Sequence, residues 1–211
     1  EEIAIAEGSL SKKAEFLTKY CCIKQTASRS WFSAEDVKKM FTDRKPIEEL
    51  ASHYCLCGID LSQTIDLSSC CLLVEDKGII WVISHFWLPG ERLSEATQRD
   101  GIPYQAMIDR GFLSLSGDAF VDYKDVYNWF TSLVQNYKIF PLMVGYDRYS
   151  SQYLIQDMEQ YGFHTDSVFQ GFNLSGISDN FEGMLKEGTI RCADDNDLLK
   201  IHMLDSAQMI E

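Results

Sequence analysis

Residues 54–86 read YCLCGIDLSQTIDLSSCCLLVEDKGIIWVISHF, and three short apolar runs follow one another in this stretch. The runs cover about 54–61, about 68–74 and Ile79–Phe86, and the second join, Glu75–Gly78, has the composition of a tight turn. Joins this short leave no room for a helix between the runs. The stretch therefore predicts three consecutive antiparallel strands.

The apolar pattern then changes to helical spacing. Apolar positions recur at that spacing from Val126 to Tyr137, and a buried strand, Ile139–Val144, follows. A strand reached through a helical crossover is expected to lie parallel to an earlier strand of its sheet. A helix at about 151–161, a strand at about 165–170 and helices near 178–187 and 195–205 complete the chain. The predicted fold class is α/β, a mixed sheet of three antiparallel strands and then parallel strands, flanked by helices, in the order of the ribonuclease H-like fold.

Residues 1–50 are richer in Lys, Glu and Ser than the rest and are expected to form a helical linker outside the core. Within them, Ser33 suits the N-cap of a helix that carries Val37, Met40 and Phe41 on one face. The domain itself is then expected to span residues 51–211. A further helix is predicted near 103–110.

Composition limits the class of protein. The chain has 211 residues, 45% of them hydrophobic, which suffices for one buried core. No apolar run approaches the roughly 18 residues of a membrane span and no signal peptide is evident, so a cytosolic protein without a membrane partner is expected. The seven cysteines lack the spacing of zinc ligands and are interpreted as reduced core residues.

A net charge of -13 argues against unassisted binding of nucleic acid, which usually depends on Lys and Arg. The objection is limited, because an enzyme that holds divalent cations needs a local cluster of carboxylates. Bound metal reverses the sign of such a patch.

Two aspartates stand at matching places on predicted strands. Asp60 ends the run Gly58-Ile-Asp60, and Asp147 ends Gly145-Tyr-Asp147. Because side chains alternate along a strand, each aspartate shares a face with the glycine two residues before it. If the strands are parallel neighbours, the two carboxylates emerge side by side and repel unless cations lie between them. An aspartate at a strand end can also be a simple turn former or helix cap, and that alternative stays open.

A third acid, Asp66, lies where the chain turns back. With a hairpin centred near Gln63, Asp66 is expected to face Asp60 and to serve as a further ligand or to hold a metal-bound water. Hard oxygen ligands of this kind suit two Mg²⁺ or Mn²⁺ ions, which would supply the chemistry of phosphodiester hydrolysis. Asp60 and Asp147 are the candidate catalytic residues, with Asp60 as the bridging ligand, and Asp60, Asp147 and Asp66 are the candidate metal ligands.

From about residue 54 onward the chain resembles the nuclease domain of the large terminase subunits of tailed phages. The matching segments are Gly58–Ser62 with Asp66–Ser68, Phe86–Pro89, Val121–Tyr123, Gly145–Asp147, and Phe169–Gly171 with the pair Leu174-Ser175. Upstream, Phe16–Lys19 before Trp31 resembles the end of the family's ATPase domain, although the asparagine often found after that lysine is not evident. A phosphate-binding G-x-x-x-x-G-K-[ST] loop is absent from the sequence, so a C-terminal fragment is expected.

The resemblance implies an endonuclease that cuts concatemeric double-stranded viral DNA during genome packaging. It implies as partners the DNA, the portal protein and the small terminase subunit, and as location the host cytoplasm with transient attachment to the procapsid. One departure is that the family's last metal-binding acid follows an isoleucine near the C-terminus, and no such pair occurs before Glu211. That acid is expected beyond Glu211, with Asp205 as a less favoured substitute. The alternatives are an inactive docking module of the packaging motor and a nuclease of the resolvase or transposase kind.

Overall fold

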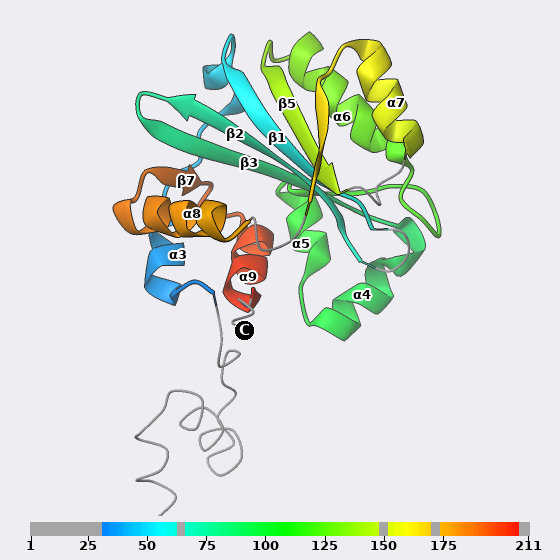
Figure 1. The fold of residues 1–211 in the computed structure, drawn as a ribbon. Coiled ribbons are helices and arrows are strands. Elements are labelled where there is room, and N and C mark those ends of the chain that lie inside the picture. The colour runs from blue at the N-terminus through cyan, green and yellow to red at the C-terminus, as the bar shows by residue number, and fades with distance from the viewer. Residues whose placement is uncertain (1–30, 63–65, 148–151, 170–173, 207–211) are drawn as a thin grey trace, which may run out of the picture.

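The computed structural model describes residues 31–62, 66–147, 152–169 and 174–206. Seven strands in this part of the chain form one mixed sheet, and helices lie on both of its faces (Figure 1). The elements in chain order are α3 (Ala34–Met40), η1 (Ile47–Leu50), β1 (Tyr54–Asp60), β2 (Ser68–Asp76), β3 (Ile79–Leu88), η2 (Gly90–Arg92), α4 (Leu93–Asp100), α5 (Tyr104–Asp109), β4 (Leu113–Leu115), α6 (Tyr123–Gln135), β5 (Phe140–Asp147), α7 (Gln152–Tyr161), β6 (Thr165–Val168), α8 (Ser175–Glu187), β7 (Ile190–Cys192) and α9 (Asp197–Asp205).

The sheet order is β4-β3-β2-β1-β5-β6, and β7 pairs with β3 beside this path. The strands β1, β2 and β3 are antiparallel, whereas β5 pairs with β1, and β6 with β5, in parallel. Both the predicted meander and the predicted parallel pairing are therefore confirmed, as is the ribonuclease H-like order. The turn between β2 and β3 places Lys77 at φ 55° and Gly78 at φ 80°, a left-handed conformation that glycine adopts readily.

Side chains alternate between the two faces of the sheet, so the core has one part on each face. On one face, Cys57, Ile59 and Leu72 pack beneath Phe130 of α6 and Met158 of α7. On the other face, α3, α8 and α9 cover one end of the sheet around Val82 and Ile190, while α4 and α5 pack around Phe86 and Leu88. The cysteines of the described segments are free thiols, and Cys55, Cys57, Cys70 and Cys192 are buried, in agreement with their interpretation as core residues.

The segment before β1 differs from expectation. Ser33 caps α3 as predicted, accepting a hydrogen bond from the Asp36 amide at 3.1 Å. Val37 and Met40 are, however, 1% and 2% exposed and pack against α8, α9 and β7. The expectation that this segment lies outside the core is therefore wrong for the described residues, because its apolar face finds a partner at the far end of the chain. The boundary near residue 50 stays a prediction.

Besides the short helices η1 and η2, three elements were not expected from the pattern. The strands β4 and β7 have three residues each, too few to show alternation, and α4 buries only Ala96. Phe16–Lys19, Cys21 and Cys22 lie outside the described residues, as does part of Phe169–Gly171. Among the described helices, none combines the length and the apolar character needed to cross a membrane.

Candidate metal centre

Asp60 and Asp147 stand at the carboxyl ends of neighbouring parallel strands. Gly58 lies opposite Gly145 and Ile59 opposite Tyr146, so the next residue on each strand is an aspartate. Neighbouring strands are about 4.8 Å apart, which brings the two side chains together on the face away from α6 and α7. Both aspartates line one cavity of about 390 Å³, the strand cavity, together with Cys71.

The two glycines leave space on the same face. A Cβ atom built on Gly145 would lie 3.0 Å from Val168 Cγ2, and one on Gly58 would lie 3.3 Å from Cys71 Sγ. Both distances are shorter than ordinary van der Waals contact. A larger residue at either position would require the neighbouring side chain to shift, so the recurring Gly-x-Asp pattern has a steric reason.

The surroundings of Asp60 disfavour its charged form. Burial, then the charges of Asp147 and Asp66, raise the pKa of the Asp60 carboxyl. A divalent cation between the carboxylates would remove this repulsion, and hard oxygen donors suit Mg²⁺ or Mn²⁺. The residues present thus fit a bound divalent cation.

Asp66 is not where a simple hairpin would put it. Asp60 lies opposite Ser69, so the expectation that Asp66 faces Asp60 across the hairpin is wrong. The connection is a wider loop whose ends are fastened by serines, since Ser68 Oγ accepts from the Ser62 amide and Ser62 Oγ accepts from the Asp66 amide, each at 3.1 Å. Asp66 nevertheless stays within electrostatic reach of Asp60.

A second cavity opens from the same aspartate toward α4. This α4 cavity, of about 620 Å³, is lined by both Asp60 and Asp66 and by Arg99, Tyr104 and Asp205. Asp205, the suggested substitute for the family's last acid, therefore faces the same space as Asp60. Arg99 and Tyr104 are not among the expected site residues, because no pattern within α4 or α5 indicates that these helices lie beside β1.

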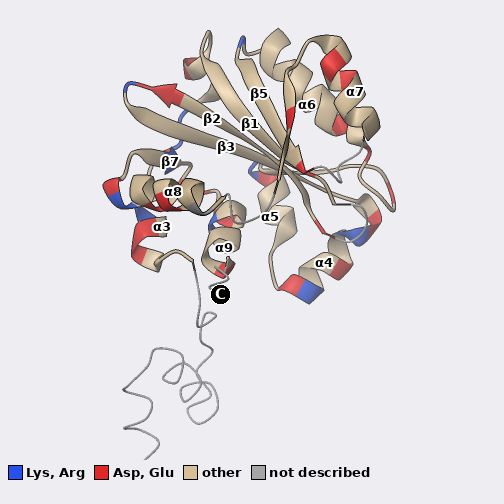
Figure 2. Cartoon of the chain, in the orientation of Figure 1, with Lys and Arg blue, Asp and Glu red and all other residues tan. Residues whose placement is uncertain are grey.

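In the described part of the chain, no three His, Cys, Asp or Glu side chains come close enough together to hold a metal ion. Within the same segments, the pair Asp60 and Asp147 thus stands without a third ligand at coordinating distance. Acidic residues are spread over most elements, and basic residues occur on α4 close to this region (Figure 2).

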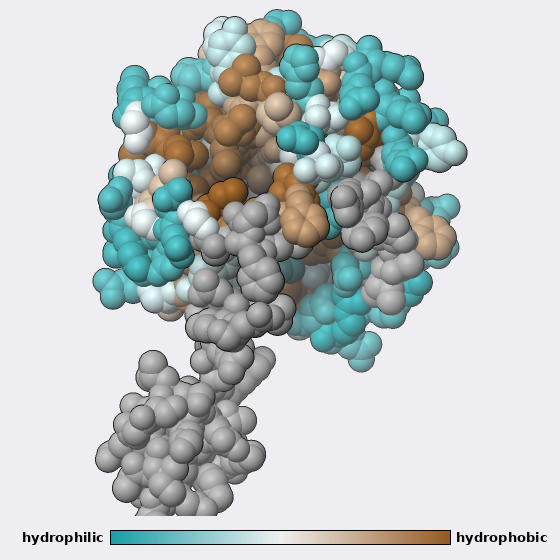
Figure 3. Space-filling model, viewed as in Figure 1, coloured by the Kyte–Doolittle hydropathy of each residue, from teal (hydrophilic) through white to brown (hydrophobic). Residues whose placement is uncertain are grey.

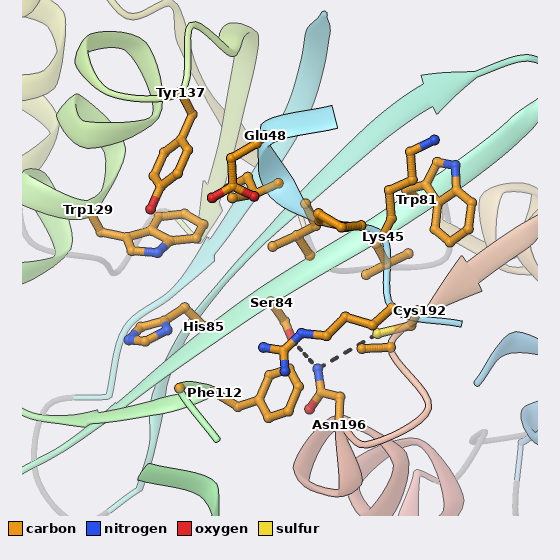
Figure 4. Close-up of a pocket in the computed structure, with 17 residues that line it drawn as sticks. Lys45, Glu48, Trp81, Ser84, His85, Phe112, Trp129, Tyr137, Cys192 and Asn196 are labelled. Carbon is orange, nitrogen blue, oxygen red and sulfur yellow. Dashed lines mark hydrogen bonds between the residues drawn. The ribbon is translucent and has the colours of Figure 1, made fainter. Parts of the chain in front are cut away.

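A separate cavity of about 480 Å³ contains neither member of the pair. It lies where the outer edge of β3 is left uncovered between β4 and β7 (Figure 4). There the Asn196 side-chain amide donates to Ser84 Oγ at 2.9 Å, and the Arg44 guanidinium lies 5.0 Å from the centre of the Phe112 ring. His85 also lines this cavity, but no cluster of acids does.

Comparison with known proteins gives a consistent family. A family model described as terminase large subunit, endonuclease domain matches residues 1–211. The crystal structure of the bacteriophage HK97 large terminase matches with a TM-score of 0.67 and 22% identity, over 82% of this chain and 36% of that one. The large terminase of a thermophilic bacteriophage matches with a TM-score of 0.55 and 13% identity, over 85% and 38%. At these identities the two structures establish the fold alone.

The chain spans little more than a third of the length of those two terminases. The large terminase nuclease of another thermophilic phage, G20c, with bound magnesium has a TM-score of 0.48 and 13% identity, over 82% of this chain and 78% of that one. A similarity this weak supports no inference. No curated protein matches the chain.

Proposed function

Because the chain belongs to the family of terminase large subunit endonuclease domains, we propose that it is a metal-dependent endonuclease that cuts concatemeric double-stranded viral DNA during genome packaging. The observation that supports this proposal most is the pairing of Asp60 and Asp147 at adjoining strand ends. Burial first, and then the charges of Asp147 and Asp66, raise the pKa of the Asp60 carboxyl.

In this proposal Asp60 and Asp147 would hold the cations, with Asp60 as the candidate for the shared ligand. When bound, Mg²⁺ or Mn²⁺ ions supply an activated water and stabilise the leaving oxygen of a phosphodiester. The role of the protein is to hold the carboxylate oxygens in place. The ends of two hydrogen-bonded strands give them a rigid support. Asp66, on the loop beside Asp60, is proposed as a further ligand or as the acceptor for a metal-bound water.

The test is nicking of supercoiled plasmid in manganese by the wild-type chain and by Asp60→Ala and Asp147→Ala. Each substitution is expected to lower the rate on the order of 100-fold or more, because several kcal/mol of charge stabilisation are lost. Asp157→Ala, which removes an exposed aspartate in the middle of α7, is the matched control and is expected to leave the rate unchanged.

The same assay discriminates a second candidate, an inactive docking module, which is favoured by the lack of a third ligand among the described residues. Nicking by the wild type that both substitutions leave intact would refute the site. If the wild type does not nick the plasmid, and manganese does not raise its thermal unfolding temperature, the docking module is favoured over the nuclease.

Membership of this family supports two further proposals, one for the partners of the chain and one for its location. The partners proposed are double-stranded DNA, the portal protein and the small terminase subunit. The location proposed is the host cytoplasm, with transient attachment to the procapsid. A resolvase or transposase-like nuclease is less favoured, because the chain carries 32 acidic and 19 basic residues and so lacks a strongly basic surface.

A further inference from the structure

Two cavities open from Asp60, and they differ in their basic residues. The strand cavity and the α4 cavity share Asp60, Ser69, Phe86 and Leu199. The lining of the strand cavity includes Asp60 and Asp147 and no Lys, Arg or His, whereas that of the α4 cavity includes Arg99 and His202 beside Asp60, Asp66, Asp100 and Asp205. A DNA strand carries one negative charge per nucleotide, and Arg99 is the guanidinium that the α4 cavity offers it.

An apolar groove lies next to the strand cavity, on the same face of β1. Tyr54, Leu56 and Leu142 line this groove and are 63%, 52% and 52% exposed. Hydrophobic residues gather in a hollow on this face of the molecule (Figure 3). The lining of this groove contains no Lys or Arg, so it offers the backbone of DNA no guanidinium or ammonium group.

Arg99 is held in a fixed position in the α4 cavity. Its Nε and Nη2 atoms donate to the two carboxylate oxygens of Asp100 at 2.6 and 2.9 Å. The Tyr104 hydroxyl donates to the same carboxylate at 2.9 Å, and Tyr104 is itself buried. The buried tyrosine thus anchors Asp100, and Asp100 orients the guanidinium.

The Arg99 guanidinium has N–H groups left to donate to a ligand. It has five N–H groups, of which the two bonds to Asp100 use two. The other three have no hydrogen-bond partner among the described residues, and the side chain is about two-fifths exposed. A planar fork with free donors is the geometry that binds phosphate oxygens.

We propose that the α4 cavity takes the DNA strand on one side of the phosphodiester that is cut, and that Arg99 binds a phosphate of this strand. The proposal rests on the proposed function and adds the path of the DNA across an acidic molecule. Arg99 would contact a phosphate next to the reacting one, while Asp60 and Asp147 hold the cations at the reacting one.

The test is binding of a fluorescent DNA duplex in calcium, followed by anisotropy across a series of salt concentrations. Arg99→Gln is expected to weaken binding about tenfold and to lower the slope of log affinity against log salt by about 1, since one phosphate contact is lost. Arg99→Gln with Asp100→Asn keeps the net charge of the wild type and is expected to show the same lower slope.

Arg92→Ala is the matched control. Arg92 precedes the same helix, has similar exposure and is paired with Glu95, but lines neither cavity. It is expected to bind within about twofold of the wild type with an unchanged slope. Thermal unfolding of each variant establishes that all of them are folded.

Plasmid nicking in manganese by the same preparations separates the two proposals. If the wild type cuts DNA but both Arg99 variants bind with the wild-type slope, the proposal for Arg99 is overturned and the nuclease assignment stands. If the wild type neither binds nor cuts, both are overturned.

Discussion

At the scale of single residues, Asp60 and Asp147 depend on the glycines that precede them. Gly58 and Gly145 lie directly opposite each other, and neither position can take a Cβ atom without moving a neighbour. The sequence shows these glycines and aspartates plainly. It cannot show that Val168 and Cys71 close in on the glycines, because those contacts come from other strands.

His85 gives a prediction at the same scale. Its ring lies against Trp87 and Trp129, with Nε2 2.9 Å from Ser114 Oγ, and burial lowers the pKa of His85 to about 4. In the unfolded chain the imidazole of His85 should take up a proton near pH 6.5. The stability contributed by neutral His85 is therefore full above about pH 6.5 and lost as the pH falls to about 4.

The unfolding free energy of the wild type is expected to fall between about pH 6.5 and 4, and His85 accounts for roughly 3 kcal/mol of that fall. In His85→Gln this part of the fall should be absent. Urea unfolding at a series of pH values measures this directly. His164→Gln, at an exposed position, should leave the pH dependence as it is in the wild type. Equal curves for the wild type and His85→Gln would show that His85 is not buried in neutral form.

At the scale of elements, α3 is the clearest departure from expectation. Its apolar face packs against α8, β7 and α9, which lie at residues 175–205, near the other end of the chain. Periodicity correctly located the helix, but periodicity contains no information about which distant surface a helix covers. The same limit explains why the three-residue strands β4 and β7 were missed, since they exist only as partners of β3.

Met40→Ala tests whether α3 belongs to the core. Met40 is 2% exposed, and truncation of a buried methionine is expected to cost about 2–5 kcal/mol of unfolding free energy. Lys38→Ala on the exposed face of the same helix is expected to change stability by less than about 0.5 kcal/mol. Similar denaturation midpoints for both variants would mean that α3 packs only loosely on the domain.

At the scale of the whole molecule, the net charge of -13 sets the conditions for contact with DNA. Without divalent cations the acidic centre repels a phosphate backbone, whereas bound cations reverse the local sign. We expect millimolar calcium to tighten duplex binding by roughly tenfold or more, measured by anisotropy at constant ionic strength.

The variant Asp60→Asn with Asp147→Asn is the informative comparison. It removes two negative charges, so it should bind DNA more tightly than the wild type in the absence of divalent cations and gain less from calcium. A calcium response equal to that of the wild type would place the responsible cation site elsewhere on the molecule.

Much of the fold and part of the candidate site followed from local pattern. The three-strand meander, the crossover through α6 and the strand-end aspartates all rest on short-range periodicity, which residues 54–86 and 126–147 carry strongly. Asp66 was placed wrongly, because a symmetrical hairpin was assumed where side chains of Ser62 and Ser68 hold a wider loop. Such side-chain bonds cannot be read from spacing.

The sequence by itself determined the chain order of β1, β2, β3, β5 and β6, the glycine with which each aspartate shares a face, and the family to which the chain is similar. These properties depend on alternation along one segment, so neighbouring residues carry them. Only the tertiary structure decided that Asp205 and Arg99 face the same space as Asp60, and that an arginine lines the α4 cavity but not the strand cavity. Those properties depend on contacts between segments far apart in the chain, which packing of the whole molecule determines.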